Sequence, residues 1–294
     1  MERSSHPYMA WKICIANQKG GVGKTTSAVN LAASLAVLGR RCLLIDLDPQ
    51  GNATSGLGLD KSTLRRSIYH VLVEDDPLGS VILPTAVPHL SLAPANIDLS
   101  GAELEMVPLE NRERLLAQRL AATPAEYEFV LIDCPPSLGL LTVNALAAAD
   151  SVLVPVQCEY YALEGLSQLL NTVTLVKRRL NPHLKIEGFL LTMFDIRNRI
   201  CSQVADEVRG HFQERVFQTL VARNVRLSEA PSHGQPALLY DPASRGAQAY
   251  LEAARELLVR HAARAEDAAP ERKVHAGNVH AGKVDEGRVK EGER

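Results

Sequence analysis

The residues best suited to chemistry lie in one short run near the start of the chain, Lys19-Gly-Gly-Val-Gly-Lys-Thr-Thr26. Glycines let backbone N–H groups approach phosphate oxygens closely. An apolar run precedes the segment and a helical pattern follows it, so a helix N-terminus would face the same phosphates. This context predicts a phosphate-binding loop in which Lys24 reaches the β- and γ-phosphates of a nucleotide and Thr25 binds Mg²⁺. The expected nucleotide contacts are Lys19, Gly20, Gly21, Val22, Gly23, Lys24, Thr25 and Thr26.

Two apolar runs end in carboxylates. Asp46 and Asp48 begin a polar, turn-rich segment that continues to Ser55, and Asp133 ends Val130-Leu-Ile-Asp before Cys-Pro-Pro-Ser-Leu-Gly139. Because parallel sheets place ligands at the carboxyl ends of their strands, we expect these carboxylates to face the phosphate loop. The Asp133 arrangement is typical of a Walker B strand, which predicts a Mg²⁺ contact there, with Asp48 and Thr25 in the same metal site. For Asp46 two roles stay open, support of the metal site and support of the loop.

Apolar runs that alternate with helical patterns must position these residues. Near-continuous apolar strands covered by helices predict an α/β fold with a doubly wound, mostly parallel sheet and helices on both faces. The expected strands are 11–16, 42–46, 129–133, 152–156 and 186–193, with weaker candidates at 90–93 and 216–220. The expected helices are 24–38, 112–121, 138–149, 163–180, 202–212 and 244–261.

The composition indicates how the chain divides into domains, where in the cell it is expected and what it can bind. With 294 residues and 46% hydrophobic residues, we expect a flexible N-terminus at 1–10, one domain at 11–264 and a disordered tail at 265–294. The tail contains a glycine-bearing five-residue repeat from Val274, which offers little apolar surface for a core. A net charge of −2 means that any DNA-binding surface must be a local basic patch. No signal peptide or apolar run of ~18 residues is present, which predicts a cytoplasmic protein without membrane attachment.

The phosphate loop departs from the ordinary Walker A pattern, and this departure is typical of one group of ATPases. Position 18 is Gln rather than Gly, and Lys19 lies five residues before Lys24, which is the deviant Walker A pattern KGGxGK[ST]. The chain also contains three longer motifs, in the ranges 92–101, 155–166 and 223–234. Over roughly residues 11–260 it resembles the ParA/Soj proteins, the ATPases that segregate bacterial chromosomes and plasmids.

The resemblance implies an ATP-driven switch. In such proteins the residue equivalent to Lys19 reaches across a homodimer to the partner's ATP, and Asp48 would help to position the attacking water. Asn224 would lie near the adenine, where Ala222 replaces the usual proline and predicts a looser loop. The ATP dimer would bind double-stranded DNA without sequence preference and associate with the nucleoid, and a ParB-like partner would accelerate a slow hydrolysis. The basic residues 197–226 would face DNA, with the candidate contacts Arg197, Arg226 and, more weakly, Arg245.

Other classes are less consistent with the sequence. The tail is punctuated by glycine and mixed in charge, unlike the membrane-binding helix that ends MinD-like proteins. Cys134, beside Asp133, is already explained by the family motif, so an iron–sulfur protein is not indicated. A metabolic enzyme that activates a small substrate with ATP, and a scaffold or repressor that binds ATP without turnover, remain as alternatives.

Overall fold

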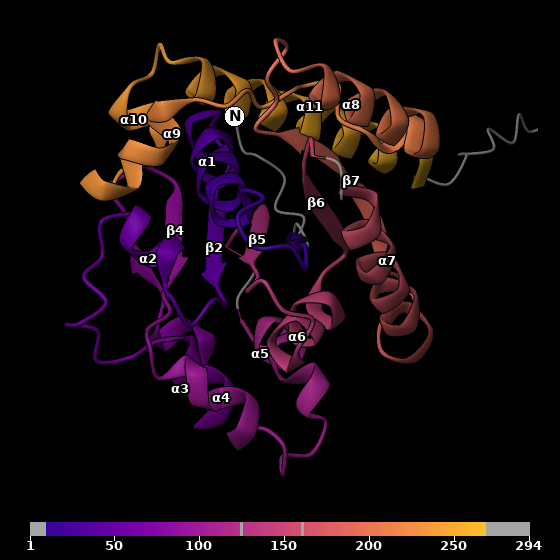
Figure 1. Ribbon diagram of the computed structural model, residues 1–294. Coiled ribbons are helices and arrows are strands. Elements are labelled where there is room, and N and C mark those ends of the chain that lie inside the picture. Colours follow the sequence, from indigo (N-terminus) through magenta and orange to yellow (C-terminus); the bar gives the residue numbers. More distant parts are fainter. Residues whose placement is uncertain (1–9, 124–125, 160–161, 269–294) are drawn as a thin grey trace, which may run out of the picture. The chain divides into compact units, whose positions relative to one another are not determined.

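The computed structural model describes residues 10–123, 126–159 and 162–268. A seven-stranded sheet with the order β3-β4-β2-β5-β1-β6-β7 forms the centre of the fold (Figure 1). Every adjacent pair is parallel except β3 and β4 at one edge. The strands are β1 Trp11–Ile15, β2 Cys42–Asp46, β3 Leu83–Pro84, β4 Leu90–Ala93, β5 Phe129–Asp133, β6 Ser151–Gln157 and β7 Lys185–Thr192. This order confirms the predicted doubly wound, mostly parallel sheet.

Side chains of the central strands alternate between two cores, one on each face of the sheet. Ile13 and Ile15 of β1 belong to one core and Cys14 to the other, as the two-residue period of a strand requires. Helices α1 and α11 cover the first face, while α3 to α8 cover the second. The helices are α1 Lys24–Val37, α2 Asn52–Gly56, α3 Ile68–Val73, α4 Leu99–Glu105, α5 Leu115–Ala121, α6 Leu140–Ala148, α7 Ala162–Arg179, α8 Arg199–Phe212, α9 Val225–Glu229, α10 Ala237–Tyr240 and α11 Arg245–Ala268.

The predicted strand at 216–220 is wrong. Val216 makes only an isolated bridge to Phe189 of β7. The carboxylate of Glu256 on α11 accepts hydrogen bonds from the backbone N–H groups of Gln218 and Thr219, at 2.9 and 3.0 Å. These two donors are therefore not available for a ladder with β7, and the segment contacts this strand through single backbone hydrogen bonds, such as that from the Phe217 N–H to the Phe189 carbonyl at 2.9 Å.

Several short elements were not predicted. The antiparallel edge strand β3 has two residues, and helices α2, α3, α4, α9 and α10 have four to seven residues each. The helix expected at 112–121 begins instead as a 3₁₀ turn, Arg112–Arg114, before α5. Helices of this length give too few turns for a periodic apolar pattern.

The structure also describes the cysteines and the apolar character of the helices. All five cysteines are free and buried. None of the helices in the described part of the chain has the length and apolar character needed to cross a bilayer.

The chain divides into two compact units, residues 1–258 and 259–294. Helix α11 runs on to Ala268, so the domain boundary expected at 264 falls inside this helix. The expected flexible N-terminus lies, apart from Ala10, outside the described residues, as does the five-residue repeat.

We propose that the chain after α11 contributes nothing to the core, and we expect truncation after Ala268 to leave the melting temperature and ATP affinity unchanged. Differential scanning fluorimetry with and without ATP measures both quantities. A drop in melting temperature of about 4 °C, roughly 1 kcal/mol or more for a domain of this size, would contradict this assignment of the tail.

Candidate nucleotide site

The phosphate loop joins the end of β1 to the start of α1. Gly21 and Gly23 have φ angles of 74° and 89°, a left-handed conformation that side chains with a Cβ rarely adopt. Gly23 is the N-cap of α1, so the free N–H groups at the start of this 14-residue helix face the loop. A cavity of about 360 Å³ is lined by Gly20, Gly21, Gly23, Lys24, Thr25, Thr26, Asp48, Gln50, Asn52, Pro136 and Met193. The structure therefore brings most of the predicted phosphate-loop residues and Asp48 to one cavity.

The two lysines of the loop have different surroundings. Lys24 is buried, and its Nζ donates to the carbonyl oxygen of Lys19 at 3.0 Å. Burial lowers the pKa of Lys24, an effect opposed mainly by the nearby Asp133 carboxylate. The half-exposed Lys19 ammonium instead forms an ion pair with Glu159 at 2.8 Å, and Lys19 does not line the phosphate cavity. Of the two lysines, only Lys24 therefore lines the phosphate cavity.

Asp133 ends β5 beside the phosphate loop. Its carboxylate is fully buried, and neither oxygen has a hydrogen-bond partner among the described residues. Burial and, second, the neighbouring Asp46 carboxylate raise the pKa of Asp133 well above its ordinary value, while Thr25 and Lys24 oppose this shift. A buried carboxylate without a partner is costly unless a cation or another donor compensates it. Asp133 and the Thr25 hydroxyl therefore fit a Mg²⁺ site.

The remaining donors also suit Mg²⁺. Among residues 10–123, 126–159 and 162–268 no group of three or more His, Cys, Asp or Glu side chains could hold a metal ion alone. Magnesium is commonly bound by one or two carboxylates together with substrate phosphates and water, so the site needs no such cluster. Asp48 lies at the wall of the phosphate cavity, where its Oδ1 accepts a hydrogen bond from the backbone N–H of Gln50 at 2.9 Å.

Asp46 organises the loop that follows β2. Its Oδ2 accepts hydrogen bonds from the backbone N–H and the hydroxyl of Thr54, at 2.8 and 2.7 Å, and its Oδ1 accepts one from the N–H of Asp48 at 3.1 Å. Burial raises the pKa of Asp46 to about 6, although the Thr54 hydrogen bonds act in the opposite direction. Of the two roles left open by the sequence, these contacts favour support of the loop, because both oxygens already have partners there.

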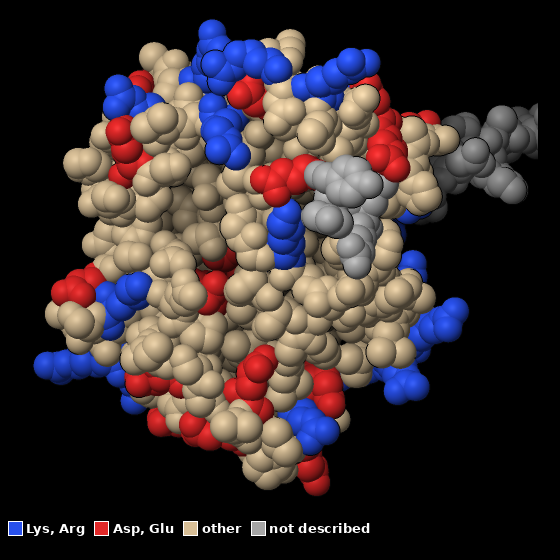
Figure 2. All heavy atoms as spheres, viewed as in Figure 1, with Lys and Arg blue, Asp and Glu red and all other residues tan. Residues whose placement is uncertain are grey.

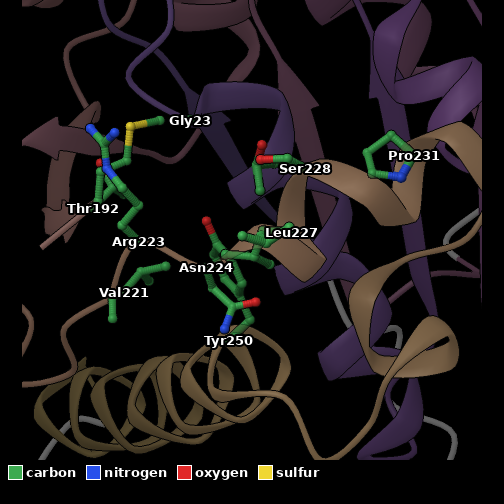
Figure 3. Close-up of a pocket in the computed structure, with 13 residues that line it drawn as sticks. Gly23, Thr192, Val221, Arg223, Asn224, Leu227, Ser228, Pro231 and Tyr250 are labelled. Atoms are coloured by element: carbon green, nitrogen blue, oxygen red, sulfur yellow. The ribbon is translucent and has the colours of Figure 1, made fainter.

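A second cavity, of about 450 Å³, adjoins the phosphate cavity and shares Gly23, Thr26 and Met193 with it. Figure 3 shows labelled residues of this cavity from the phosphate loop, from the end of β7 and from the segment 221–231, together with Tyr250 of α11. Asn224 lines the cavity and caps α9, since its Oδ1 accepts a hydrogen bond from the Arg226 N–H at 2.9 Å. The two adjoining cavities match the two parts of a nucleotide, a base with its sugar and a phosphate chain.

Backbone hydrogen bonds connect the loop around Ala222 to β7. Val221 donates from its N–H to the Leu191 carbonyl at 2.9 Å, and its own carbonyl accepts from the Phe194 N–H at 3.0 Å. The Arg223 N–H donates in turn to the Phe194 carbonyl at 3.1 Å. These bonds connect the loop to the end of β7.

The arginines predicted to contact DNA lie close to this cavity but differ in their contacts. Arg197 is exposed and forms an ion pair with Asp195 at 2.8 Å. Arg226 forms ion pairs with Glu229 and Asp241, at 2.8 and 3.1 Å. Arg245 is exposed at the start of α11, where the next residue, Gly246, packs against Leu227 of α9. Figure 2 shows Lys and Arg side chains gathered over the elements α8 to α10, so the basic residues form a local patch.

Sequence reasoning missed three residues that shape the site. The Thr192 hydroxyl donates to the Val22 carbonyl at 2.8 Å and thereby links the end of β7 to the phosphate loop. Asn17 accepts a hydrogen bond from the Lys19 N–H and donates to the Pro155 carbonyl. Met193 lines both cavities with a φ of 51°, a conformation that is uncommon for a residue other than glycine. Only Asn17, a polar residue at a strand end beside the loop, offered a local signal.

Comparisons with known proteins agree with this geometry. A family profile described as an AAA domain matches residues 10–186. The chromosome partitioning protein ParA of Myxococcus xanthus is 57% identical over 262 residues, which are 89% of this chain and 91% of that protein. The sporulation initiation inhibitor protein Soj of Bacillus subtilis is 58% identical over 245 residues, which are 83% of this chain and 97% of that protein.

A solved structure adds the ligands. Cobyrinic acid a,c-diamide synthase from Mycobacterium smegmatis, with bound ADP and magnesium, superposes with a TM-score of 0.76 at 38% identity. The match covers 87% of this chain and 97% of that one. The nucleotide and the metal of that structure are ligands of the kind that the two cavities and the buried Asp133 of this chain would fit. Because its identity to ParA and Soj extends over more than four fifths of the sequence, the chain belongs to the ParA/Soj family of partitioning ATPases.

Proposed function

We propose that this ATPase is a dimerising switch that binds DNA without sequence preference and hydrolyses ATP to drive chromosome or plasmid segregation with a ParB-like partner. The observation that supports the switch best is the different placement of the two lysines. Lys24 lines the phosphate cavity, whereas the Lys19 ammonium lies outside it and pairs with Glu159. A second lysine at the edge of the loop is suited to the nucleotide of a second subunit.

The residues of the site would divide the chemistry as follows. Lys24 and the N–H groups at the start of α1 would bind the β- and γ-phosphates. Thr25 and Asp133 would hold Mg²⁺, which neutralises phosphate charge when it is bound. Asp48 would also lie in the metal site and orient the water that attacks the γ-phosphate. Asn224 would contact the base. No covalent nucleophile is needed, because phosphoryl transfer to water depends mainly on positioning and charge neutralisation.

DNA binding would follow dimer formation. Few arginine–phosphate contacts would form in one subunit, and Arg197 and Arg226 must each exchange a carboxylate partner for a phosphate. Two subunits double the number of contacts, which makes binding depend on ATP. Because phosphates convey no base information, we expect little preference among sequences. The ATP-bound dimer would then associate with the nucleoid, and hydrolysis stimulated by the partner would return single subunits to the cytoplasm.

The DNA surface can be tested at Arg226. We expect Arg226→Ala to abolish or greatly weaken ATP-dependent DNA binding and to leave ATP-dependent dimer formation intact. The slope of log affinity against log salt concentration is expected to fall by about 0.9 for each lost phosphate contact, measured by fluorescence anisotropy with a random-sequence duplex.

Arg40→Ala is the matched control for this experiment. Arg40 is also exposed and paired with a carboxylate, Glu128, but it lies just before the amino end of β2, whereas the nucleotide site lies at the carboxyl ends of the strands. We expect it to leave DNA affinity unchanged. An Arg226→Ala dimer with unchanged affinity and salt slope would overturn the placement of the DNA surface but not the ATPase assignment.

A second candidate function is a metabolic enzyme that uses ATP to activate a small acceptor. The name of the Mycobacterium smegmatis structure is the observation that favours it. The relatives with the higher identity, at 57 and 58%, are partitioning and sporulation proteins. ATP turnover that responds to DNA and a ParB-like protein would support the switch, whereas turnover that responds only to a small acceptor would support the enzyme.

A further inference from the structure

Helix α4 and the turn before it present a short apolar stripe to solvent, formed by Ile97 and Leu104. The inner face of α4, formed by Leu99, Ala102 and Met106, is fully buried in the core. Ile97, in the turn before α4, and Leu104 on the helix are 73% and 77% exposed. Of the large apolar side chains in the described part of the chain, Ile196 near the basic patch is the one that is more exposed, at 81%. Two large apolar side chains left in solvent on one short segment mark a candidate contact surface for a partner.

Acidic side chains flank this stripe. Asp98, Glu103 and Glu105 lie beside the apolar residues, and none of them forms an ion pair with Lys or Arg in the part of the chain that the structure describes. Asp98 and Glu105 instead accept hydrogen bonds from the neutral groups of Asn96 and Tyr69. Figure 2 shows acidic side chains gathered over α3, α4 and the loop toward α5, away from the basic patch over α8 to α10. The surface therefore favours a cationic partner and disfavours DNA.

The same helix is connected to one loop of the nucleotide site. The Oε1 of Glu103 accepts a hydrogen bond from the N–H of Leu141 at 3.1 Å, in the first turn of α6. The same carboxylate lies directly against Gly139, so a side chain at that position would displace the Glu103 carboxylate. Gly139 ends the loop that begins at Asp133. A partner bound to α4 can therefore act on this loop through Glu103.

The segment before α4 is connected to the other loop. The Ala95 N–H donates to the Thr54 hydroxyl at 2.9 Å, and that hydroxyl donates to Asp46. Gly51 also lies against the Ala95 carbonyl, since a Cβ there would be 2.8 Å from its oxygen. The loops that contain Asp48 and Asp133 thus both contact the run 95–103, although this run contributes no residue to the nucleotide cavities.

We propose that the surface formed by Ile97, just before α4, and by Gly101 and Leu104 of α4 is the docking surface for a short segment of the partner in which Lys or Arg residues lie beside apolar side chains. This inference rests on the proposed partner-stimulated switch and identifies where the partner acts. Gly101 lies between the two apolar residues and lets another chain approach the helix backbone closely. A second copy of this chain fits poorly, because a two-fold axis would place the same three carboxylates opposite one another.

The test uses Leu104→Glu in the full chain and a full-length ParB-like protein from the same genome as the probe. We expect hydrolysis without the partner, ATP-dependent dimer formation and DNA binding to stay as in the unchanged chain. We expect the partner-stimulated increase in hydrolysis to fall by about tenfold or more, since loss of an exposed apolar anchor and like-charge repulsion both oppose docking. Leu175→Glu on α7 is the matched control, because Leu175 is also exposed, and it is expected to retain full stimulation.

Each outcome decides a different point. Unchanged stimulation of Leu104→Glu would overturn the docking surface while leaving the proposed function intact. Loss of the ATP dimer in Leu104→Glu would also overturn it and would make α4 an interface between copies. If the unchanged chain itself is not stimulated, the partner in the proposed function fails, and the docking surface fails with it. Ile97→Ser, which adds no charge, gives the same comparison if Leu104→Glu lowers the melting temperature.

Glu103 tests the connection to the loop. We expect Glu103→Ala to bind the partner with near-normal affinity, measured by biolayer interferometry, and to lose most of the stimulation. Glu103→Gln retains a side-chain oxygen that can accept the Leu141 N–H, so it is expected to restore stimulation. If Glu103 had a purely structural role, Glu103→Ala would lower the melting temperature, and partner binding and stimulation would fall together. Equal stimulation of the unchanged chain, Glu103→Ala and Glu103→Gln would exclude the connection.

Discussion

Replacing Lys24 by alanine is expected to raise the dissociation constant for ATP by about a hundredfold or more. Lys24 is the one lysine of the phosphate loop that lines the cavity, and its buried ammonium lies near Asp133 and Asp48. Hydrogen bonds to charged groups contribute roughly 1.5–3 kcal/mol each, and Lys24 would make one to each of two phosphates. Isothermal titration calorimetry with a non-hydrolysable ATP analogue and Mg²⁺ measures the change.

Lys12→Ala is a suitable control for that experiment. Lys12 also lies on β1 and pairs with Asp150, but at the amino end of the strand, so its loss is expected to leave ATP affinity unchanged. The melting temperature of both variants shows whether they are folded. Normal ATP affinity in a folded Lys24→Ala protein would contradict the phosphate-loop assignment.

Lys19→Gln and Asp48→Ala are expected to have opposite effects on the oligomeric state. Lys19→Gln is expected to bind ATP and remain a monomer, because its lysine is directed outside its own phosphate cavity. Asp48→Ala is expected to dimerise with ATP and stay dimeric, because the attacking water is no longer positioned. Size-exclusion chromatography with light scattering in the presence of ATP distinguishes the two outcomes.

Glu159→Gln separates two explanations for a Lys19 effect. It removes the ion pair with Lys19 but keeps the lysine, so it is expected to dimerise with ATP. A monomeric Glu159→Gln protein would assign the effect to the ion pair rather than to a contact with the partner's nucleotide. Identical elution of Lys19→Gln and Asp48→Ala would refute the division of roles between these two residues.

The sheet and the phosphate loop were predictable because their signals are local. Each central strand is a short apolar run, and Asp46 and Asp133 end two of these runs, so their pairing at one register was implied by a parallel sheet. The glycine pattern of Gly20–Thr26 specifies a backbone conformation as well as a ligand. These features depend on residues within one element, which the sequence presents directly.

The contacts that adjust the site were not predictable in this way. Thr192 meets Val22 across 170 positions, and Glu103 meets Leu141 across 38. The Glu256 carboxylate accepts hydrogen bonds from the backbone N–H groups of Gln218 and Thr219, so the segment 216–220 does not form the predicted strand. Side-chain to backbone bonds between distant segments leave no periodic pattern, and any Thr or Glu on the surface of a helix or at a strand end has the same local appearance.

The central claim is that ATP binding, and not merely nucleotide binding, converts this protein to its DNA-binding form. Fluorescence anisotropy of a labelled random-sequence duplex, titrated with the protein and Mg²⁺ in the presence of ATP or of ADP, tests it most directly. The account predicts binding with ATP and little or none with ADP, with an affinity that falls as salt rises. Equal DNA affinity with ATP and ADP, or none with either, would contradict it.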